Sequence, residues 1–434
     1  MKQFIVLTLL LLPILANTQM TIHERIDKRA KEIEKEVIDL RRHYHQYPEL
    51  SNREFKTAEH IAKELEKLGL KVETGIAITG VVGLLDTGKP GPTIALRADI
   101  DGLPVVERAA IPFASKEKSE FLGEEVGIMH ACGHDTHIAM QLGAAKILTE
   151  MKDELTGKIV FVFQPAEEGA PPGEEGGAEL MIKEGLIEKY GIDVFFGQHI
   201  SSATPVGHLT YKLGGIMAAA NRFVIKVKGK QTHGSRPWGG VDPITAAAQI
   251  IQGLNNIISR QTELTKEAAV ISIGKIKGGL RSNIIPEEVE MIGTIRTLDD
   301  DMRETIFEKI KKTATAIAES SGAVAEVDIN KGYPVTFNNI ELTRKMVPSL
   351  FAAAGEDNVH VIPAVTGAED FSFFANEVPS IYWFTGGWNT EEEAFPHHTP
   401  DFKLDERGMI TGVKAMAYIA VDYLMGDKPS ANGR

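Results

Sequence analysis

The sequence has a single cysteine, Cys132, so no disulfide can form within one chain. Positive charge is also in short supply, because 47 lysine and arginine residues face 60 aspartate and glutamate residues and leave a net charge of −13. This acidic excess argues against nucleic acid or an anionic membrane surface as a partner, since both carry negative charge. A lone cysteine is most often a small buried hydrophobic residue, so another role for Cys132 needs support from its neighbours.

Long hydrophobic runs are scarce as well, and the marked one is Phe4–Ala16, which follows the basic start Met1-Lys2-Gln3. This run is too short to span a bilayer and is typical of a secretory signal. We therefore expect residues 1–19 to be a signal peptide and the mature protein to be periplasmic or secreted, without stable membrane insertion. The cleavage site stays open, because no clean small-x-small pattern follows Ala16.

The length of 434 residues, with 43% hydrophobic and 25% charged residues, is that of a globular protein of about two domains. Apolar periodicity predicts a helix over 22–44, and Ser51 with Glu54 three residues later predicts a capping box that starts a second helix. Buried apolar strands that alternate with helices predict a main α/β domain with a mixed, mostly parallel sheet. The predicted strands are Gly80–Leu85, Thr93–Arg97, Lys158–Phe163, Asp193–Phe196 and Ile381–Phe384, and a further helix covers roughly 135–152.

The segment 219–327 has a different pattern, in which a strand, a helix, two strands, a helix and a strand follow one another. This β-α-β-β-α-β order is that of a ferredoxin-like α+β unit. We therefore predict a satellite domain inserted between the two parts of the main domain, 20–218 and 328–434. Its predicted elements are strands at Phe223–Val227, Ala269–Ile273, Val289–Arg296 and Val324–Ile329 and helices that begin near Asp242-Pro243 and Asp300.

Carboxylate and imidazole side chains come directly after three of the predicted main-domain strands. In an open α/β sheet the carboxyl ends of the strands form the edge where ligands bind, so we expect these groups to meet there. Within the adjacent pair Glu167-Glu168, neighbouring side chains point in different directions, so one can bind metal while the other carries a proton. The groups are Asp99 and Asp101, Glu167 and Glu168, and His199.

The densest polar cluster is Met129–His137, which holds three histidines, Cys132 and Asp135. A thiolate with imidazole and carboxylate partners suits zinc or a neighbouring divalent ion. The alternative is a polar helix entrance in which Asp135 only caps the helix and the histidines face solvent. A second pair, His397-His398, follows the last predicted strand and can reach the same edge.

Together these motifs resemble the metallo-aminohydrolase family of aminoacylases, hippurate hydrolases and auxin-conjugate (IAA-amino acid) amidohydrolases. The resemblance extends from about Ile22 to Tyr423 and rests on several motifs in the same order. The matching stretches are Arg42–Leu50, Arg97–Pro104, Met129–His137, Phe163–Glu168, Asp242–Ile244, Gly367–Phe371 and His398–Pro400.

The resemblance implies a binuclear metal centre in the main α/β domain (20–218 and 328–434), which would therefore be the catalytic domain. It also assigns roles to individual residues of that domain. Glu167 would be the general base, and Asp101 would orient a metal ligand from behind; the role of Asp99 is less defined. The family's His-x-Pro motif selects His398 over His397. The implied ligands of two divalent metal ions, manganese or zinc with cobalt or nickel as alternatives, are Cys132, His134, Glu168, His199 and His398.

The resemblance also gives the satellite domain a part in the site. His233, otherwise read as an exposed loop residue, would enter the active site of a partner subunit and polarise the scissile carbonyl. Asn283 and Arg296 would help to hold the carboxylate of the substrate. The satellite would also build a homodimer, and domain closure would complete each site.

We therefore expect an amidohydrolase that cleaves small N-acyl-amino acids to a carboxylate and a free amino acid. The nearest alternative is a dipeptidase or carboxypeptidase with a short peptide as substrate. A non-catalytic, metal-holding binding protein is the third reading, and the complete set of predicted ligands together with Glu167 argues against it.

Overall fold

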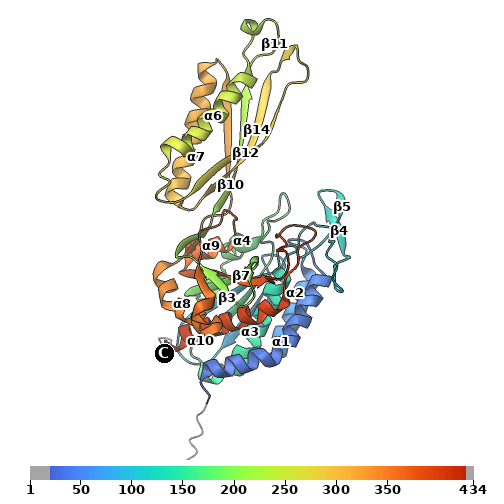
Figure 1. Cartoon of the computed structure of the whole chain (residues 1–434), viewed down its shortest axis with the longest axis vertical. Coiled ribbons are helices and arrows are strands. Elements are labelled where there is room, and N and C mark those ends of the chain that lie inside the picture. Colours follow the sequence, from blue (N-terminus) through green and yellow to red (C-terminus); the bar gives the residue numbers. More distant parts are fainter. Residues whose placement is uncertain (1–19, 427–434) are drawn as a thin grey trace, which may run out of the picture.

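The computed structural model describes residues 20–426, so the predicted signal peptide at 1–19 lies outside the described residues. An α/β catalytic domain forms the broad part of the molecule, and the satellite domain extends from it as a narrow lobe (Figure 1). Within residues 20–426, no helix is long and apolar enough to cross a membrane.

The catalytic domain is built on a mixed eight-stranded sheet with the order β1-β2-β6-β3-β7-β18-β8-β17. The central strands β6, β3, β7 and β18 are mutually parallel. Strand β2 is antiparallel to both of its neighbours, β1 and β6. The strands are β1 (Lys71–Ile76), β2 (Gly80–Asp86), β3 (Thr93–Asp99), β6 (Lys158–Gln164), β7 (Val194–Pro205), β8 (Leu209–Tyr211), β17 (Val359–Val361) and β18 (Ser380–Trp388).

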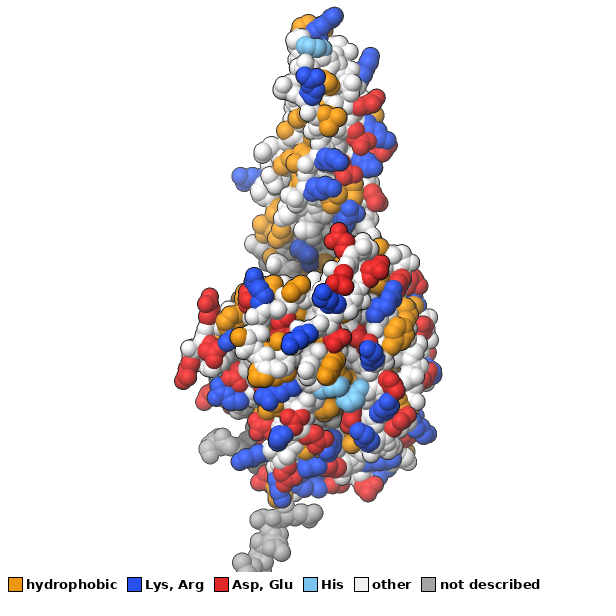
Figure 2. Space-filling model, turned by 90° about the vertical axis from the view of Figure 1, so that its right-hand side faces the viewer, with side chains coloured by type: hydrophobic (Ala, Val, Ile, Leu, Met, Phe, Trp, Pro, Cys, Tyr) orange, Lys and Arg blue, Asp and Glu red, His pale blue; other side chains and the backbone are white. Residues whose placement is uncertain are grey.

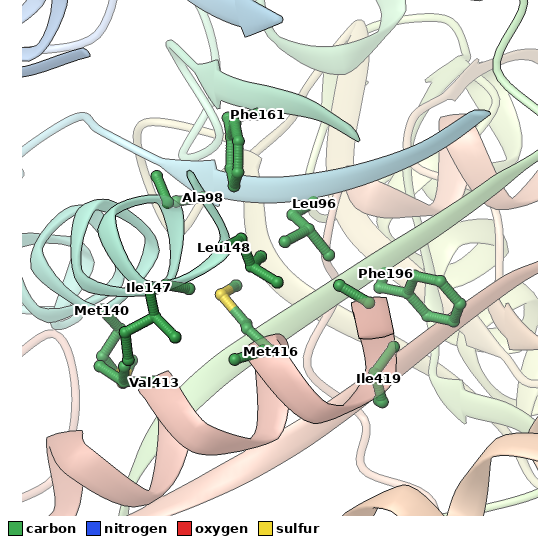
Figure 3. Packing of buried hydrophobic residues seen from close by; sticks show 14 of the residues in the cluster. Leu96, Ala98, Met140, Ile147, Leu148, Phe161, Phe196, Val413, Met416 and Ile419 are labelled. Carbon is green, nitrogen blue, oxygen red and sulfur yellow. The ribbon is translucent and has the colours of Figure 1, made fainter. Parts of the chain in front are cut away.

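Helices cover both faces of this sheet, which explains why β3 is buried along its whole length. One face packs against α1, α2, α3, α8 and α10, and Figure 3 shows side chains of α3 and α10 meeting Leu96, Phe161 and Phe196 of the strands. The other face packs against α4, α5 and α9. The helices are α1 (Ile22–Gln46), α2 (Phe55–Lys67), α3 (His134–Glu150), α4 (Gly177–Lys183), α5 (Leu186–Tyr190), α8 (Ile340–Ala354), α9 (Phe371–Glu377) and α10 (Met409–Met425).

The satellite domain has the predicted ferredoxin-like order and a four-stranded antiparallel sheet, β12-β14-β10-β15. Two helices cover one face of this sheet, and Asp242 caps the first of them by accepting from the backbone N–H groups of Ile244 and Thr245. The elements are β10 (Ala219–Lys228), α6 (Pro243–Gln261), β12 (Ala269–Gly278), β14 (Glu288–Thr297), α7 (Asp300–Ser320) and β15 (Val324–Lys331).

Short pairs of strands complete the fold. A hairpin, β4 (Lys118–Phe121) with β5 (Glu124–Gly127), extends from the catalytic domain, and β11 (Thr232–His233) pairs with β13 (Ile284–Ile285) at the end of the satellite. Near the junction of the two domains, β9 (Gly214–Met217) pairs with β16 (Thr336–Asn338).

The predicted capping box at Ser51 is wrong. Helix α2 begins at Phe55 and Glu54 is its N-cap residue, without a side-chain cap hydrogen bond. Both side chains of the proposed box have other partners: the Ser51 hydroxyl donates to Asp101 at 2.7 Å, and the Glu54 carboxylate accepts from the Thr79 hydroxyl at 2.6 Å. A local sequence signature was overridden by two long-range hydrogen bonds.

Candidate functional site

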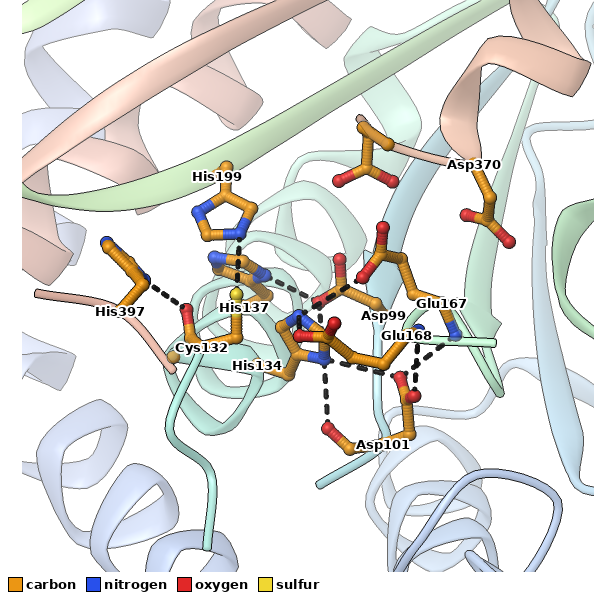
Figure 4. A network of polar contacts seen from close by, with 12 residues as sticks. Asp99, Asp101, Cys132, His134, His137, Glu167, Glu168, His199, Asp370 and His397 are labelled. Atoms are coloured by element: carbon orange, nitrogen blue, oxygen red, sulfur yellow. Dashed lines mark hydrogen bonds and ion pairs between the residues drawn. The ribbon is translucent and has the colours of Figure 1, made fainter. Parts of the chain in front are cut away.

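The carboxyl ends of three neighbouring parallel strands bring the predicted polar groups together. Strand β3 ends at Asp99 and leads to Asp101, while Glu167 and Glu168 follow β6. His199 lies within β7, which is longer than predicted and continues past the edge of β3. Figure 4 shows these side chains converging on the amino end of α3. The expected meeting of chemistry at this sheet edge is therefore present.

The cluster at 129–137 is buried, which contradicts the reading of a solvated helix entrance. His130, His134 and His137 are all at most 1% exposed. The helix is capped by Gly133 at a φ of 93° rather than by Asp135. Asp135 instead accepts from Arg41 at 2.7 Å and lies 2.8 Å from His45. These contacts fix the start of α3 against α1 and so fix the loop that carries Cys132.

The five predicted metal ligands lie in one cluster. The Cys132 Sγ is 3.3 Å from His199 Nε2 and 3.2 Å from His398 Nε2. The His398 Nε2 is also 3.0 Å from Glu168 Oε1, and His134 Nε2 is 4.0 Å from the same oxygen. Donor atoms form overlapping groups within 4.8 Å of one another. Cys132 belongs to one group with Glu168 and His398 and to another with His199 and His397, and Glu168 belongs to a third with His134 and Glu167.

The donor set fits a pair of divalent cations. The Nδ1 of His134 bonds the Asp101 carbonyl at 2.9 Å, and the Nδ1 of His199 bonds the Ile200 carbonyl at 2.5 Å, which turns both Nε2 atoms toward the cluster. Among residues 20–426, the buried His134 Nε2 has no hydrogen-bond partner. Metal-binding histidines commonly anchor the other ring nitrogen in this way. The mixture of thiol, imidazole and carboxylate suits zinc or a neighbouring first-row ion.

Asp101 holds the adjacent glutamates through their backbone. Its two carboxylate oxygens accept the Glu167 N–H and the Glu168 N–H, each at 3.1 Å. Its Oδ1 also lies 3.3 Å from His134 Nδ1. Asp101 therefore contacts the predicted ligand His134 and also holds the turn that carries the predicted ligand Glu168. This is the geometry expected of the supporting role that the resemblance implies for Asp101.

Two site residues have left-handed backbone conformations. Ala166, directly before Glu167, has a φ of 52°, and His398 has a φ of 61°. Such conformations cost energy in a residue with a side chain, and the surrounding contacts must hold them. The Ala166 N–H donates to Glu54 at 2.9 Å, and the His398 N–H donates to the Ala131 carbonyl at 2.8 Å.

His397 and His398 point to different partners. His397 bonds the Cys132 carbonyl at 3.1 Å and accepts from the Ser202 N–H at 3.1 Å, so both its ring nitrogens have backbone partners. His398 faces Cys132 and Glu168 instead. The geometry is thus the one expected if His398 is the ligand and His397 braces the thiol loop.

Burial and neighbouring charge shift the pKa values in the cluster strongly. Burial, with the nearby carboxylates of Glu369 and Glu168, raises the pKa of Glu167 well above its ordinary value. Burial also raises the pKa of the Cys132 thiol, and Glu168 adds to this effect. For His134, burial opposes the charge, but the carboxylates of Asp99 and Asp101 outweigh burial and raise the pKa to about 10. Such a concentration of shifted groups is typical of a functional site.

Three buried residues were not assigned from the sequence. His137 bonds Asp99 at 2.5 Å and accepts from the Ile200 N–H at 2.8 Å, so it braces the strand that carries His199. Glu369 and Asp370 lie beside Glu167, with carboxylate oxygens within 4.8 Å. The third histidine of the cluster at 129–137 and the Glu-Asp pair within the matching stretch Gly367–Phe371 were the available signals.

The guanidinium of Arg97 holds the carboxylates behind the site. It is fully buried and contacts Asp99 at 2.6 Å, Glu369 at 2.8 Å and Asp370 at 3.0 Å. Asp99 is therefore occupied by Arg97 and His137, and in this arrangement it supports the site from behind.

The satellite residues fall into two groups. Arg296, on β14, lines a cavity of about 860 Å³ together with Cys132, Glu167, Glu168 and His199. His233 and Asn283 lie instead at the far end of the satellite, where a histidine is visible near the tip in Figure 2. His233 is exposed, and among the described residues its side chain bonds only Ser235, at 2.7 Å from the hydroxyl. The chain thus brings Arg296 to its own site but leaves the other two distant.

Comparisons with known proteins agree with this geometry. The model of a family described as peptidase family M20/M25/M40 matches residues 95–422. Thermostable carboxypeptidase 2 of Saccharolobus solfataricus is 40% identical over 407 residues, which cover 93% of this chain and 99% of that protein. The N-acetyl-L-cysteine deacetylase of Bacillus subtilis is 38% identical over 87% of this chain and 86% of its own length. A solved structure, the Bacillus subtilis YxeP protein, described as a dinuclear metal binding peptidase, is 34% identical with a TM-score of 0.76 and covers 91% of this chain and 99% of its own.

Proposed function

The chain belongs to peptidase family M20/M25/M40, and within that family we propose that it hydrolyses small N-acyl-amino acids to a carboxylate and a free amino acid. It is accordingly a metal-dependent hydrolase of amide bonds. The observation that carries the substrate proposal is the cavity shared by Glu167, Arg296 and four of the predicted metal ligands, which are Cys132, Glu168, His199 and His398. Hydrolysis of an N-acyl-amino acid requires a base, a metal centre and a group that binds the carboxylate of the substrate.

The predicted ligands would hold two divalent ions, for which manganese and zinc are the leading candidates and cobalt or nickel the alternatives. They are Cys132, His134, Glu168, His199 and His398. When bound, such a pair lowers the pKa of water and stabilises negative charge on an amide oxygen. The Glu167 carboxylate then takes the proton from the attacking water and delivers it to the leaving nitrogen. Burial beside Glu369 and Glu168 raises the pKa of Glu167.

The cavity supports a substrate with one anionic and one apolar part. Arg296 offers a guanidinium for the carboxylate of the amino acid. Met217, Ile362 and Phe384 line the same cavity and offer an apolar wall for the acyl group. The volume of about 860 Å³ exceeds what an acetyl group needs, so larger acyl groups fit as well.

We propose that a second copy of the chain completes the site as a homodimer. His233 and Asn283 lie at the exposed end of the satellite, where they can meet another molecule. His233 would polarise the scissile carbonyl in the partner, and Asn283 would assist Arg296. Rotation of the satellite toward the catalytic domain would then close the site over the substrate.

A carboxypeptidase or dipeptidase is the second candidate, and the name of the 40% identical relative supports it. A C-terminal peptide bond and an N-acyl-amino acid share the amide and the carboxylate and differ in the acyl side. A non-catalytic binding protein is disfavoured, because Glu167 and the complete ligand set are present.

The cellular location is a separate proposal. The run Phe4–Ala16 after a basic start supports export to the periplasm or the medium.

The test is release of free amino acid from N-acetyl and N-benzoyl amino acids, with unblocked dipeptides assayed in parallel. Purified mature protein is assayed with manganese or zinc, and again after chelation. We expect metal-restored turnover on acyl compounds. Cleavage of dipeptides alone would move the assignment to dipeptidase, and bound metal without turnover on either set would favour the binding protein. N-terminal sequencing of protein secreted from an expression host tests the signal peptide.

A further inference from the structure

Tyr333 joins the segment that returns from the satellite to the turn that carries Glu167. Its hydroxyl donates to the Glu167 carbonyl at 2.7 Å, and its side chain lines the cavity. The ring is held from the side by an edge contact with Phe373, at 6.0 Å between centroids. Burial, with the charges of Asp370 and Glu167, raises the pKa of Tyr333, so the phenol keeps the proton that it donates.

The turn that Tyr333 contacts is held from two sides. On one side Asp101 accepts the backbone N–H groups of Glu167 and Glu168, each at 3.1 Å. On the other side the bond from Tyr333 fixes the carbonyl of Glu167, which belongs to the same peptide unit as the Glu168 N–H. The strained Ala166, with a φ of 52°, directly precedes this peptide. A turn under strain needs restraint on both sides to keep one orientation.

Tyr333 itself belongs to the junction between the domains. The chain enters the satellite through β10 and leaves it after β15, and the Tyr333 carbonyl accepts from the Ala220 N–H of β10 at 2.9 Å. One residue earlier, the Gly332 carbonyl accepts from Arg303 of α7 at 3.2 Å. Arg303 also donates to the Asn221 side chain at 2.7 Å, so α7 clamps both crossing strands together.

We propose that Tyr333 is a positioning residue through which the satellite hinge sets the orientation of the catalytic peptide Glu167–Glu168. The inference rests on the proposed function, because it assumes that Glu167 is the base. A movement of the satellite shifts the clamp formed by Arg303, Asn221 and Gly332, and the Tyr333 hydroxyl transmits that shift to the Glu167 carbonyl. Closure of the satellite and alignment of the base then become one event.

The test replaces Tyr333 with Phe, which removes only the hydroxyl. The matched control is Tyr418→Phe, because Tyr418 makes the same kind of bond, from its hydroxyl to the His23 carbonyl at 3.2 Å, between α10 and α1 and away from the cavity. We expect Tyr333→Phe to lower kcat about tenfold, as the loss of one hydrogen bond that aligns the base implies, with KM within about twofold. Metal content by elemental analysis and the melting temperature should match those of Tyr418→Phe.

A double-mutant cycle with Arg303→Lys tests the connection to the hinge. If both residues act on the same peptide, the combined loss in kcat is smaller than the product of the two single losses. Independent, multiplicative losses would overturn the hinge part of the proposal. Unchanged kcat in Tyr333→Phe, or a loss of kcat that matches a loss of bound metal, would overturn the positioning role. Failure of the wild-type protein to hydrolyse any amide would instead count against the proposed function alone.

Discussion

The two domains use their polar residues in opposite ways. In the catalytic domain, helices cover both faces of the sheet, so Asp101, His134 and Glu167 are at most 5% exposed, and their partners come from distant parts of the chain. In the satellite, two helices cover one face of the sheet, and His233 lies exposed on a short strand pair. The catalytic domain therefore contains a preorganised site. Exposed satellite residues such as His233 can act only on another domain or on another molecule.

This difference teaches that the buried half of the proposed site can be identified from the structure of one chain. The proposed catalytic residues are marked by long-range hydrogen bonds, shifted pKa values and left-handed backbone beside them. The tip of the satellite has none of these signs, and its role depends on another molecule. The following changes test the contrast between a self-contained site and a dependent one.

The largest effect should come from Glu167→Gln, which keeps the shape of the side chain and removes the base. We expect kcat to fall by about 10³, within the range for a general acid–base residue. Metal content should stay at the wild-type value, because Glu167 is not among the five ligands. The control is Glu179→Gln on the exposed side of α4, which should leave turnover unchanged. Substantial turnover by Glu167→Gln would show that another group acts as base.

Next should come removal of a ligand, by Cys132→Ala or His398→Ala. We expect metal affinity, measured by calorimetric titration of metal-free protein, to fall by more than about 100-fold, since even supporting residues contribute 10- to 100-fold. His208→Ala is the matched control, because this histidine bonds His360 near the surface and lies outside the cluster. Wild-type affinity in Cys132→Ala would remove the thiol from the proposed centre.

His233→Ala tests whether the tip of the satellite acts on the active site of a second chain. We expect a loss in kcat of about 100-fold, typical of one group that stabilises an oxyanion, with unchanged metal binding. Mixing this variant with Glu167→Gln under conditions of subunit exchange should restore about a quarter of wild-type activity, because half of the dimers are mixed and each has one complete site. Full activity of His233→Ala, or dimers that exchange without any recovery, would exclude action between subunits.

The smallest effect concerns stability. Burial, together with the charge of Asp101, raises the pKa of Glu54 from 4.5 to about 8. Because the folded state holds this proton more tightly than the unfolded chain, the stabilisation is complete below the unfolded pKa and is lost as the pH rises through the folded value. Glu54→Gln stays neutral, so its melting temperature should gain a few degrees on that of the wild type between about pH 5 and pH 9. A difference that does not vary with pH would contradict the shifted pKa.

Much of the fold could be predicted because its patterns are local. The helix over 22–44, the strands at Thr93–Arg97 and Lys158–Phe163 and the ferredoxin-like satellite follow from periodicity and composition, and the structure contains them. The family resemblance is confirmed by the family match. The order of strands was not predictable in this way, because β6 lies between β2 and β3, which are joined by a short turn.

The supporting residues of the site were the hardest to predict. Ser51 and Glu54 satisfy a local capping pattern, yet the structure uses them against Asp101 and Thr79. Tyr333 bonds Glu167, and Arg97 bonds Glu369. In each pair the two residues are more than 150 positions apart in the sequence, so no local pattern predicts the contact. His233 and Asn283 remain predictions, since their proposed partner is a second chain.

The most direct test is a titration of metal-free protein with manganese or zinc, in which turnover of an N-acyl-amino acid and bound metal are measured together. The account predicts that turnover reaches its maximum at two equivalents of metal per chain, and that Glu167→Gln binds the same two equivalents without turnover. Turnover that persists after complete chelation, or that reaches its maximum at one equivalent, would contradict a two-metal site in the catalytic domain.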